Sequence, residues 1–274
     1  MTSELLQIAI NTALKAGEKV LEIYQQGDFR QYQKDDLSPV TSADLTANQV
    51  IMDELTRLTP DIPVVSEESE LASLSERSRW QHYWLLDPID GTGEFIAGSG
   101  DFAVNIALVV DGWPNLGVIH APFHQTIHYA QKGKGCFKRD IQGQETLLKV
   151  AGYDGNRTLN IAVSRRQALT NVTQYLDPQF NYHHIAYGSC SLKSCLIAEG
   201  IADFYIRTGP TGEWDTGASQ IILEEAGGTI LDSEFKPLSY NKRESVMNPD
   251  FIALGNQDIP WHKVIKSFRC ERHF

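Results

Sequence analysis

A short apolar run that ends in two carboxylates is the feature that most constrains how this chain folds. Residues 84–92 have the sequence WLLDPIDGT, so Asp87 and Asp90 follow directly after the apolar run. An apolar run of this length is typical of a buried strand. Acidic side chains at the carboxyl end of such a strand lie where open α/β sheets bind their ligands. The stretch therefore predicts a ligand site at the end of a central strand.

The residues around the two carboxylates favour a metal site beside a small anion pocket. Pro88 fixes φ and has no amide donor, so we expect the backbone to turn there and to bring the Ile89 carbonyl to the side of the carboxylates. Gly91 lets a backbone amide approach an anion closely. Carboxylates together with a substrate phosphate are ligands that Mg²⁺ prefers. The same residues also form a good turn sequence, so this stretch alone leaves both interpretations open.

Three further acidic positions occur in matching settings. Glu67 follows another short apolar run. Asp215 lies at the start of a helical pattern that stops at a pair of glycines. Asp44 lies at the start of another helical pattern, with Thr41 or Ser42 as its cap. Carboxylates are favourable in the first turn of a helix, which is the simpler explanation for Asp44 and Asp215. A residue at a helix start can also project toward a metal, so the two roles are compatible.

Together these acidic stretches resemble the signature of the inositol monophosphatase superfamily, which comprises Mg²⁺-dependent, lithium-sensitive phosphatases. The signature is a Glu-Glu pair, then Asp-Pro-(Ile/Leu)-Asp-Gly-Thr, then Trp-Asp near the carboxyl end. All three parts occur here in order, at 67–68, 87–92 and 214–215. Within the superfamily the chain is most similar to the bacterial 3′(2′),5′-bisphosphate nucleotidases, which act on 3′-phosphoadenosine 5′-phosphate. The shared segments include 38–41, 94–96, 105–108, 117–122, 191–193, 198–200 and 209–211.

The resemblance implies a fold and a set of residue roles. The implied fold is of the α/β class, a five-layered αβαβα sandwich of the sugar-phosphatase type with the metal site between its two halves. By resemblance, two or three Mg²⁺ ions are held by Glu67, Asp87, Asp90, Asp215 and the carbonyl of Ile89. Asp44 and Thr92 would orient and deprotonate the attacking water, without a nucleophilic Ser or Cys. The residues assigned to the substrate are Gly91, Thr92, Cys190, Lys193 and Arg207.

The chain departs from the nucleotidase pattern around the substrate. Gly93 stands where that group usually has Lys, Cys190 stands where it has Ser, and the run 164–167 is Ser-Arg-Arg-Gln in place of Ser-Arg-Ser-His. The leading prediction remains hydrolysis of 3′-phosphoadenosine 5′-phosphate to AMP and phosphate. An inositol or sugar-phosphate phosphatase is the alternative within the class. An inactive sensor that binds metal or nucleotide is the alternative outside it.

Composition and charge agree with one enzyme-sized domain. The 274 residues are expected to form a single domain with two packed halves, about 1–155 and 156–274. A formal net charge of −11 argues against nucleic-acid binding. No apolar run approaches the roughly 20 residues that span a bilayer, and the four cysteines lack metal-type spacing. We expect a small phosphate ester as partner, a monomer or homodimer, and a cytoplasmic location that leaves peripheral membrane association open.

The rest of the pattern predicts alternating helices and strands. Helices are expected at about 3–26, 45–59, 165–176, 190–200 and after Trp214, and strands at 62–66, 84–86, 159–164 and 202–207. Three antiparallel strands are expected over about 102–139, with turns near 111–114, 122–125 and 133–135. A polar loop at 27–40 is in a position to close over the site. This alternation indicates a mixed sheet between helical layers.

Overall fold

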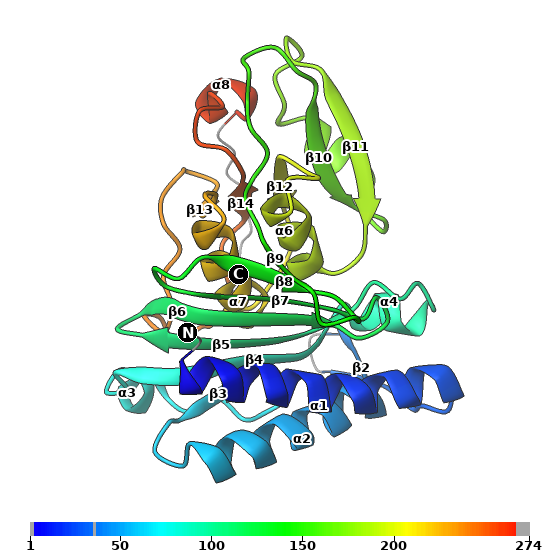
Figure 1. Cartoon of the computed structure of the whole chain (residues 1–274), viewed down its shortest axis with the longest axis vertical. Coiled ribbons are helices and arrows are strands. Elements are labelled where there is room, and N and C mark those ends of the chain that lie inside the picture. The colour runs from blue at the N-terminus through cyan, green and yellow to red at the C-terminus, as the bar shows by residue number, and fades with distance from the viewer. Residues whose placement is uncertain (1–2, 35–36, 267–274) are drawn as a thin grey trace.

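The computed structural model of the chain describes residues 3–34 and 37–266 and contains two main sheets (Figure 1). The first sheet has seven strands, all from residues 64–147. In spatial order these are β3 (Val64–Ser66), β4 (His82–Asp90), β5 (Ala103–Val110), β6 (Trp113–Ala121), β7 (Thr126–Gln131), β8 (Cys136–Arg139) and β9 (Glu145–Leu147). β3 and β4 pair in parallel, and the other neighbouring pairs are antiparallel.

The second sheet has five strands from residues 159–254. In spatial order these are β11 (Tyr182–Tyr187), β10 (Leu159–Ser164), β12 (Phe204–Arg207), β14 (Phe251–Leu254) and β13 (Thr229–Asp232). β10 is parallel to both of its neighbours, whereas β14 is antiparallel to β12 and β13. The predicted mixed sheet is therefore present in each half of the chain.

Helices form three layers around the two sheets (Figure 1). Four of the described helices pack against the first sheet, namely α1 (Glu4–Gln26), α2 (Ser42–Leu58), α6 (Cys190–Ala198) and α7 (Glu213–Glu225). α1 and α2 cover the outer face of the first sheet, and α6 and α7 lie between the sheets. The short helices α5 (Thr170–Thr173) and α8 (Trp261–Val264) cover the outer face of the second sheet. The order of layers is αβαβα, which confirms the predicted fold class.

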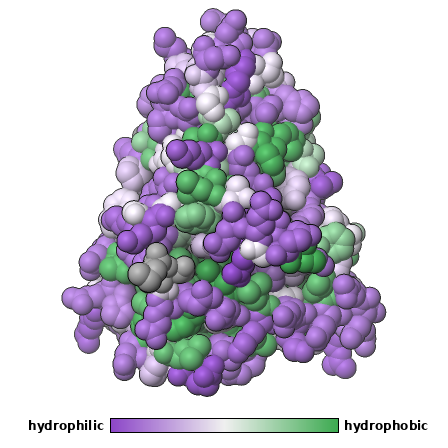
Figure 2. All heavy atoms as spheres, viewed as in Figure 1, coloured by the Kyte–Doolittle hydropathy of each residue, from purple (hydrophilic) through white to green (hydrophobic). Residues whose placement is uncertain are grey.

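The surface agrees with this layered arrangement. The molecule is broad at the first sheet with α1 and α2, and it tapers toward the second sheet and α8 (Figures 1 and 2). Hydrophilic side chains cover most of the face in Figure 2, and hydrophobic ones form small separate groups. Among the described helices, none combines the length and the apolar character that crossing a bilayer requires.

Strand β4 is buried on both faces, which explains its uninterrupted apolar run. Side chains alternate between the faces of a strand. Leu85 therefore packs in the core between the sheets, whereas Trp84 and Leu86 pack against α1 and α2. The indole Nε1 of Trp84 donates to Thr59 Oγ1 at 3.0 Å, so the one polar atom of this side chain is satisfied.

The end of β4 differs from the predicted turn. The strand continues through Pro88 to Asp90, and its pairing with β5 shifts register between Asp87 and Asp90. Asp87 is opposite Asn105 and Asp90 is opposite Ala103, so β4 contains one extra residue. This is a β-bulge, and Pro88 suits it because proline cannot donate to the ladder.

Several other elements also differ from the expected pattern. The three turns predicted within 102–139 are present, but they separate four strands (β5 to β8) and not three. The helix predicted at 165–176 is reduced to the four residues of α5. Strand β11 was not predicted, because its polar residues lack a clear alternation. The segment 27–40 contains a hairpin of β1 (Gln31–Gln33) and β2 (Pro39–Thr41), and residues 35–36 lie outside the described part.

A glycine in α1 allows this helix to approach the first sheet closely. Gly17 faces His120 on β6, and a Cβ atom built at position 17 would lie 2.2 Å from the imidazole Nδ1. His120 is buried, and its Nδ1 lies 3.0 Å from the carbonyl oxygen of Ala13. The imidazole thus fills the space that a larger residue at position 17 would need.

Replacing Gly17 with Ala should destabilise the protein although alanine is the better helix former. Overpacking of a tight core contact costs about 1–3 kcal/mol. We expect a decrease of this size in the free energy of unfolding, measured with urea. Gly152→Ala is the matched control, because its Cβ would meet no atom within 4 Å. Equal unfolding free energies for the two variants would contradict the proposed close contact.

Candidate functional site

Three carboxylates converge at the end of β4, beside the starts of α6 and α7. Asp87 and Asp90 come from the bulged end of β4, and Asp215 is the third residue of α7. One oxygen from each of the three lies within 4.8 Å of the others. Burial, followed by repulsion from neighbouring carboxylates, raises the pKa values of Asp87 and Asp215 well above their usual range. The cluster is therefore a place where a cation would be strongly favoured.

Asp215 is fixed by its place in α7. Its Oδ2 accepts a hydrogen bond of 2.6 Å from the amide of Gly212, which is the residue before the helix. The prediction that Asp215 belongs to the first helical turn is confirmed. The carboxylate also belongs to the acidic cluster, so Asp215 caps the start of α7 and contributes to the candidate site at the same time.

Asp90 is held by the start of α6. Its Oδ2 accepts from the hydroxyl of Ser189 at 2.5 Å and from the amide of Ser191 at 2.6 Å, and its Oδ1 accepts from the amide of Cys190 at 3.0 Å. These groups come from the second half of the chain, and Ser189 has a positive φ of 55°. The serine contacts could not be predicted, because nothing in the sequence pattern links residue 90 to residues 189–191.

Glu67 lies beside the cluster but has a different partner. Glu67 lines the cavity that opens beside the three carboxylates, and its Oε1 lies 2.8 Å from Nζ of Lys34. Lys34 also pairs with Glu68 at 2.7 Å. Lys34 belongs to the polar loop 27–40, so this loop reaches the edge of the site, and its closing over the site stays a prediction. Lys34 was not among the predicted site residues.

Asp44 and Thr92 form a second pair at the site. Asp44 is buried at the start of α2, and its Oδ2 accepts from the amide and hydroxyl of Thr41, which confirms the capping box. The hydroxyl of Thr92 lies 2.8 Å from the other oxygen, Oδ1, and 3.2 Å from the carbonyl of Ile89. Burial raises the pKa of Asp44. The pair thus joins α2 to the end of β4 and to the short helix α4 (Thr92–Ile96).

The donor atoms in this region fit a hard divalent cation. They are carboxylate oxygens and the Ile89 carbonyl, and the three converging side chains include no sulfur or imidazole. Oxygen donors of this kind suit Mg²⁺, Ca²⁺ or Mn²⁺. Three carboxylates within 4.8 Å of one another also need the positive charge that such a cation provides.

A cavity of about 290 Å³ opens beside the carboxylates. The predicted residues that line it are Glu67, Asp87, Ile89, Asp90, Gly91, Thr92, Cys190, Lys193, Arg207 and Asp215. Asp44 is not in the lining and lies behind Thr92. The lining also includes residues that were not predicted, namely Ser38, Gly93, Glu94, Ser164, Arg166, Ser189, Pro210, Thr211, Gly212, Trp214 and Met247.

Lys193, Cys190 and Arg207 are the predicted substrate residues from the second half of the chain, and they differ in burial and charge. Lys193 is buried; its ammonium group contacts the carbonyl of Ser189 and lies 4.8 Å from the ring centroid of Tyr205. Burial raises the pKa of the Cys190 thiol, so this group stays neutral. Arg207 is partly exposed and donates from Nη2 to the carbonyl of Pro210 at 3.1 Å.

Comparison with known proteins identifies the family. The model of the inositol monophosphatase family matches residues 1–267. The chain belongs to this family. Two relatives named 3′(2′),5′-bisphosphate nucleotidase CysQ, from Aggregatibacter actinomycetemcomitans and Haemophilus influenzae, are 45% and 40% identical over 267 residues, which cover 97% of this chain and 98% of each relative. The crystal structure of CysQ from Bacteroides thetaiotaomicron is 36% identical, with a TM-score of 0.79 over 92% of this chain and 97% of that one.

The carboxylate cluster predicts that a hard divalent cation such as Mg²⁺ stabilises the protein. Binding at 100 times the Kd stabilises a native state by about 2.7 kcal/mol, which corresponds to about 5 °C or more in Tm for a chain of this size. We expect this shift for the wild type in a thermal unfolding experiment with MgCl₂. Asp87→Asn should abolish most of it, because the variant removes one charge from the cluster.

Two further measurements test whether the Mg²⁺ effect arises at the carboxylate cluster. Asp87→Asn should be more stable than the wild type in a chelator, because repulsion within the cluster decreases. Asp61→Asn is the control, since Asp61 is an exposed carboxylate outside the site. A full Mg²⁺ shift in Asp87→Asn would show that the ion acts elsewhere.

Proposed function

We propose that this member of the inositol monophosphatase family is a Mg²⁺-dependent 3′(2′),5′-bisphosphate nucleotidase. It would convert 3′-phosphoadenosine 5′-phosphate to AMP and phosphate, in the cytoplasm. The observation that carries the proposal is a single cavity whose lining contains both the buried carboxylates and the cations Arg166 and Arg207. Such a cavity offers a metal site for one phosphate and cationic groups for another. The names of the CysQ relatives support the same substrate.

Asp87, Asp90, Asp215 and the Ile89 carbonyl would hold the metal, with Glu67 as a further ligand. Glu67 would exchange its contact with Lys34 for a contact with a cation. When bound, two or three Mg²⁺ ions would neutralise phosphoryl oxygens and make water a better nucleophile. The protein's part is to fix the carboxylates in place before the substrate arrives, which the hydrogen bonds of Asp90 and Asp215 do.

Asp44 and Thr92 would move the proton of the attacking water. Because the Thr92 hydroxyl donates to Asp44, its oxygen lone pairs can accept a hydrogen bond from water. The raised pKa of Asp44 makes this carboxylate a better base than an exposed aspartate. Attack by water would be direct, without a covalent intermediate on Cys190, whose thiol stays protonated.

Gly91 shapes the backbone that would receive the phosphate. It has a φ of 97°, which an L side chain rarely adopts, and a Cβ there would lie 3.0 Å from the carbonyl of Asp101. The backbone at Gly91 and Thr92 can therefore line the cavity closely. An inositol or sugar-phosphate phosphatase is the second candidate, because Gly93, Gln167 and Cys190 depart from the nucleotidase pattern.

The direct test is phosphate release in the presence of Mg²⁺. The substrates are 3′-phosphoadenosine 5′-phosphate, inositol 1-phosphate and fructose 1,6-bisphosphate, each with and without Li⁺. We expect preference for the nucleotide and a loss of at least about 1000-fold in Asp87→Asn, since such charge stabilisation supplies several kcal/mol. Asp87 is a better target than Asp90, whose carboxylate also anchors α6. Preference for inositol 1-phosphate would favour the second candidate, and no release from any substrate would contradict a phosphatase.

A further inference from the structure

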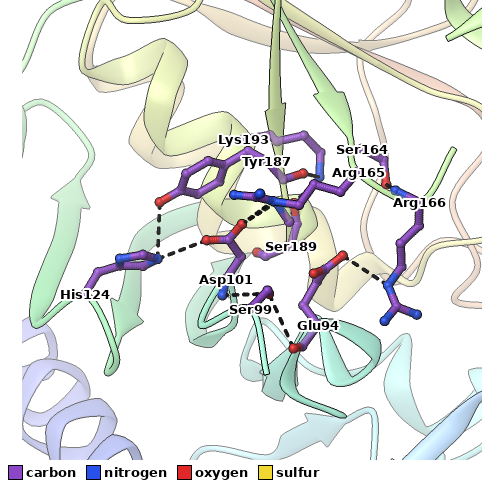
Figure 3. Close-up of polar contacts among 11 residues, drawn as sticks. Glu94, Ser99, Asp101, His124, Ser164, Arg165, Arg166, Tyr187, Ser189 and Lys193 are labelled. Atoms are coloured by element: carbon purple, nitrogen blue, oxygen red, sulfur yellow. Dashed lines mark hydrogen bonds and ion pairs between the residues drawn. The ribbon is translucent and has the colours of Figure 1, made fainter. Parts of the chain in front are cut away.

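Two adjacent arginines at the end of β10 point in different directions (Figure 3). Arg165 points toward Asp101 and donates from Nε to its Oδ2 at 2.8 Å. Asp101 is buried, and it also accepts from the amide of Gly188 at 2.9 Å and contacts His124 Nε2 at 3.1 Å. This network keeps Arg165 out of the cavity lining. Arg165 is therefore a structural residue.

Arg166 points the other way and lines the cavity (Figure 3). Its Nε donates to Glu94 Oε1 at 3.1 Å, and its Nη2 donates to the carbonyl of Gly93 at 2.5 Å. Its amide also donates to the hydroxyl of Ser164 at 3.3 Å. Within the described part of the chain, the Nη1 group has no hydrogen-bond partner. The guanidinium is thus held in place by two contacts while one of its edges stays available to a ligand.

The absence of a side chain at residue 93 makes this position possible. A Cβ built at Gly93 would lie 3.0 Å from Nη1 and 3.3 Å from Cζ of Arg166. Gly93 is the second residue of α4, and its φ is not in the left-handed region, so its backbone does not require glycine. Glycine instead leaves room for the guanidinium that lies over it, which a Cβ atom would displace by a few tenths of an ångström. Residues 93 and 166 both depart from the nucleotidase pattern, and the structure shows that they are in contact.

The other cations of the cavity are more buried than Arg166. Lys193 is 2% exposed, and its ammonium group contacts backbone carbonyls. Arg207 has one nitrogen, Nε, that is buried without a partner, and its Nη2 contacts Pro210. The side chain of Arg166 is 54% exposed, and its contacts within residues 3–34 and 37–266 leave both N–H groups of Nη1 without a hydrogen-bond partner. A phosphate that enters this cavity can therefore contact Arg166 without breaking any of its existing hydrogen bonds.

We propose that Arg166, positioned by Glu94 and made possible by Gly93, binds the phosphate of a bisphosphate substrate that is not hydrolysed. This inference rests on the proposed function and names the residue that selects a bisphosphate over a monophosphate. The reacting phosphate lies beside the carboxylates, and the other phosphate accepts hydrogen bonds from Nη1. Arginine suits this role because its planar group can contact a protein oxygen and a phosphate at once.

The test compares hydrolysis of 3′-phosphoadenosine 5′-phosphate with that of adenosine 3′-monophosphate, which lacks the second phosphate. We expect Arg166→Ala to raise KM for the bisphosphate about tenfold, the effect of one charge-assisted hydrogen bond of about 1.4 kcal/mol. kcat for the bisphosphate and both constants for the monophosphate should stay close to those of the wild type. The preference for the bisphosphate should therefore decrease about tenfold.

Two variants separate this role from a structural one. Arg165→Gln removes the neighbouring guanidinium, which does not line the cavity, and should keep the wild-type preference. The double variant Gly93→Lys with Arg166→Ala places a different cation in the space that Arg166 leaves, and should restore part of the preference. Circular dichroism and Tm values confirm that each variant is folded.

The outcomes distinguish this inference from the proposed function. If the wild type releases no phosphate from the bisphosphate, the proposed function is wrong and this assignment is wrong with it. If the wild type is active and Arg166→Ala weakens both substrates equally, only the assignment of Arg166 is wrong. The same conclusion follows if Arg165→Gln reduces the preference as much as Arg166→Ala does.

Discussion

The hydrogen bonds that Asp90 accepts from the start of α6 are the interaction on which the site depends. Asp90 ends a strand of the first sheet, whereas residues 189–191 come from the second half of the chain. A helix start has unpaired amides and a partial positive charge, so a carboxylate from another element is a favourable partner. The same carboxylate belongs to the acidic cluster. One contact therefore joins the two halves and fixes part of the geometry of the acidic cluster.

Helix α7 places the third carboxylate through close packing on the first sheet. A Cβ at Gly217 would lie 2.8 Å from Cδ2 of Leu85, and one at Gly117 would lie 2.8 Å from Cα of Ala218. These glycines let the helix lie directly on β4 to β6, which brings Asp215 to the end of β4. Packing in the core between the sheets thus opposes the repulsion among the carboxylates.

The sequence predicts the parts of the site that depend on local pattern. The capping box of Asp44, the first-turn position of Asp215 and the buried strand before Asp87 all follow from short stretches of sequence, and the structure confirms these positions. Contacts between residues that are far apart in the sequence could not be predicted from local pattern. The pairing of Arg166 with Glu94 joins residues 72 positions apart, and that of Lys34 with Glu67 joins residues 33 positions apart. Strand β11 was missed because its stability comes from pairing with β10 and not from its own pattern.

The bulge at the end of β4 also constrains the spacing of the acidic motif. In a regular strand, residues separated by three positions lie on opposite faces. Asp90 would then point toward α1 and α2, away from Asp87, and would bury a charge in the outer core. The one extra residue in β4 reverses this parity and puts both carboxylates on the inner face. A chain that paired regularly from residue 87 to residue 90 would keep both acidic side chains in its sequence and still separate them by the thickness of the sheet.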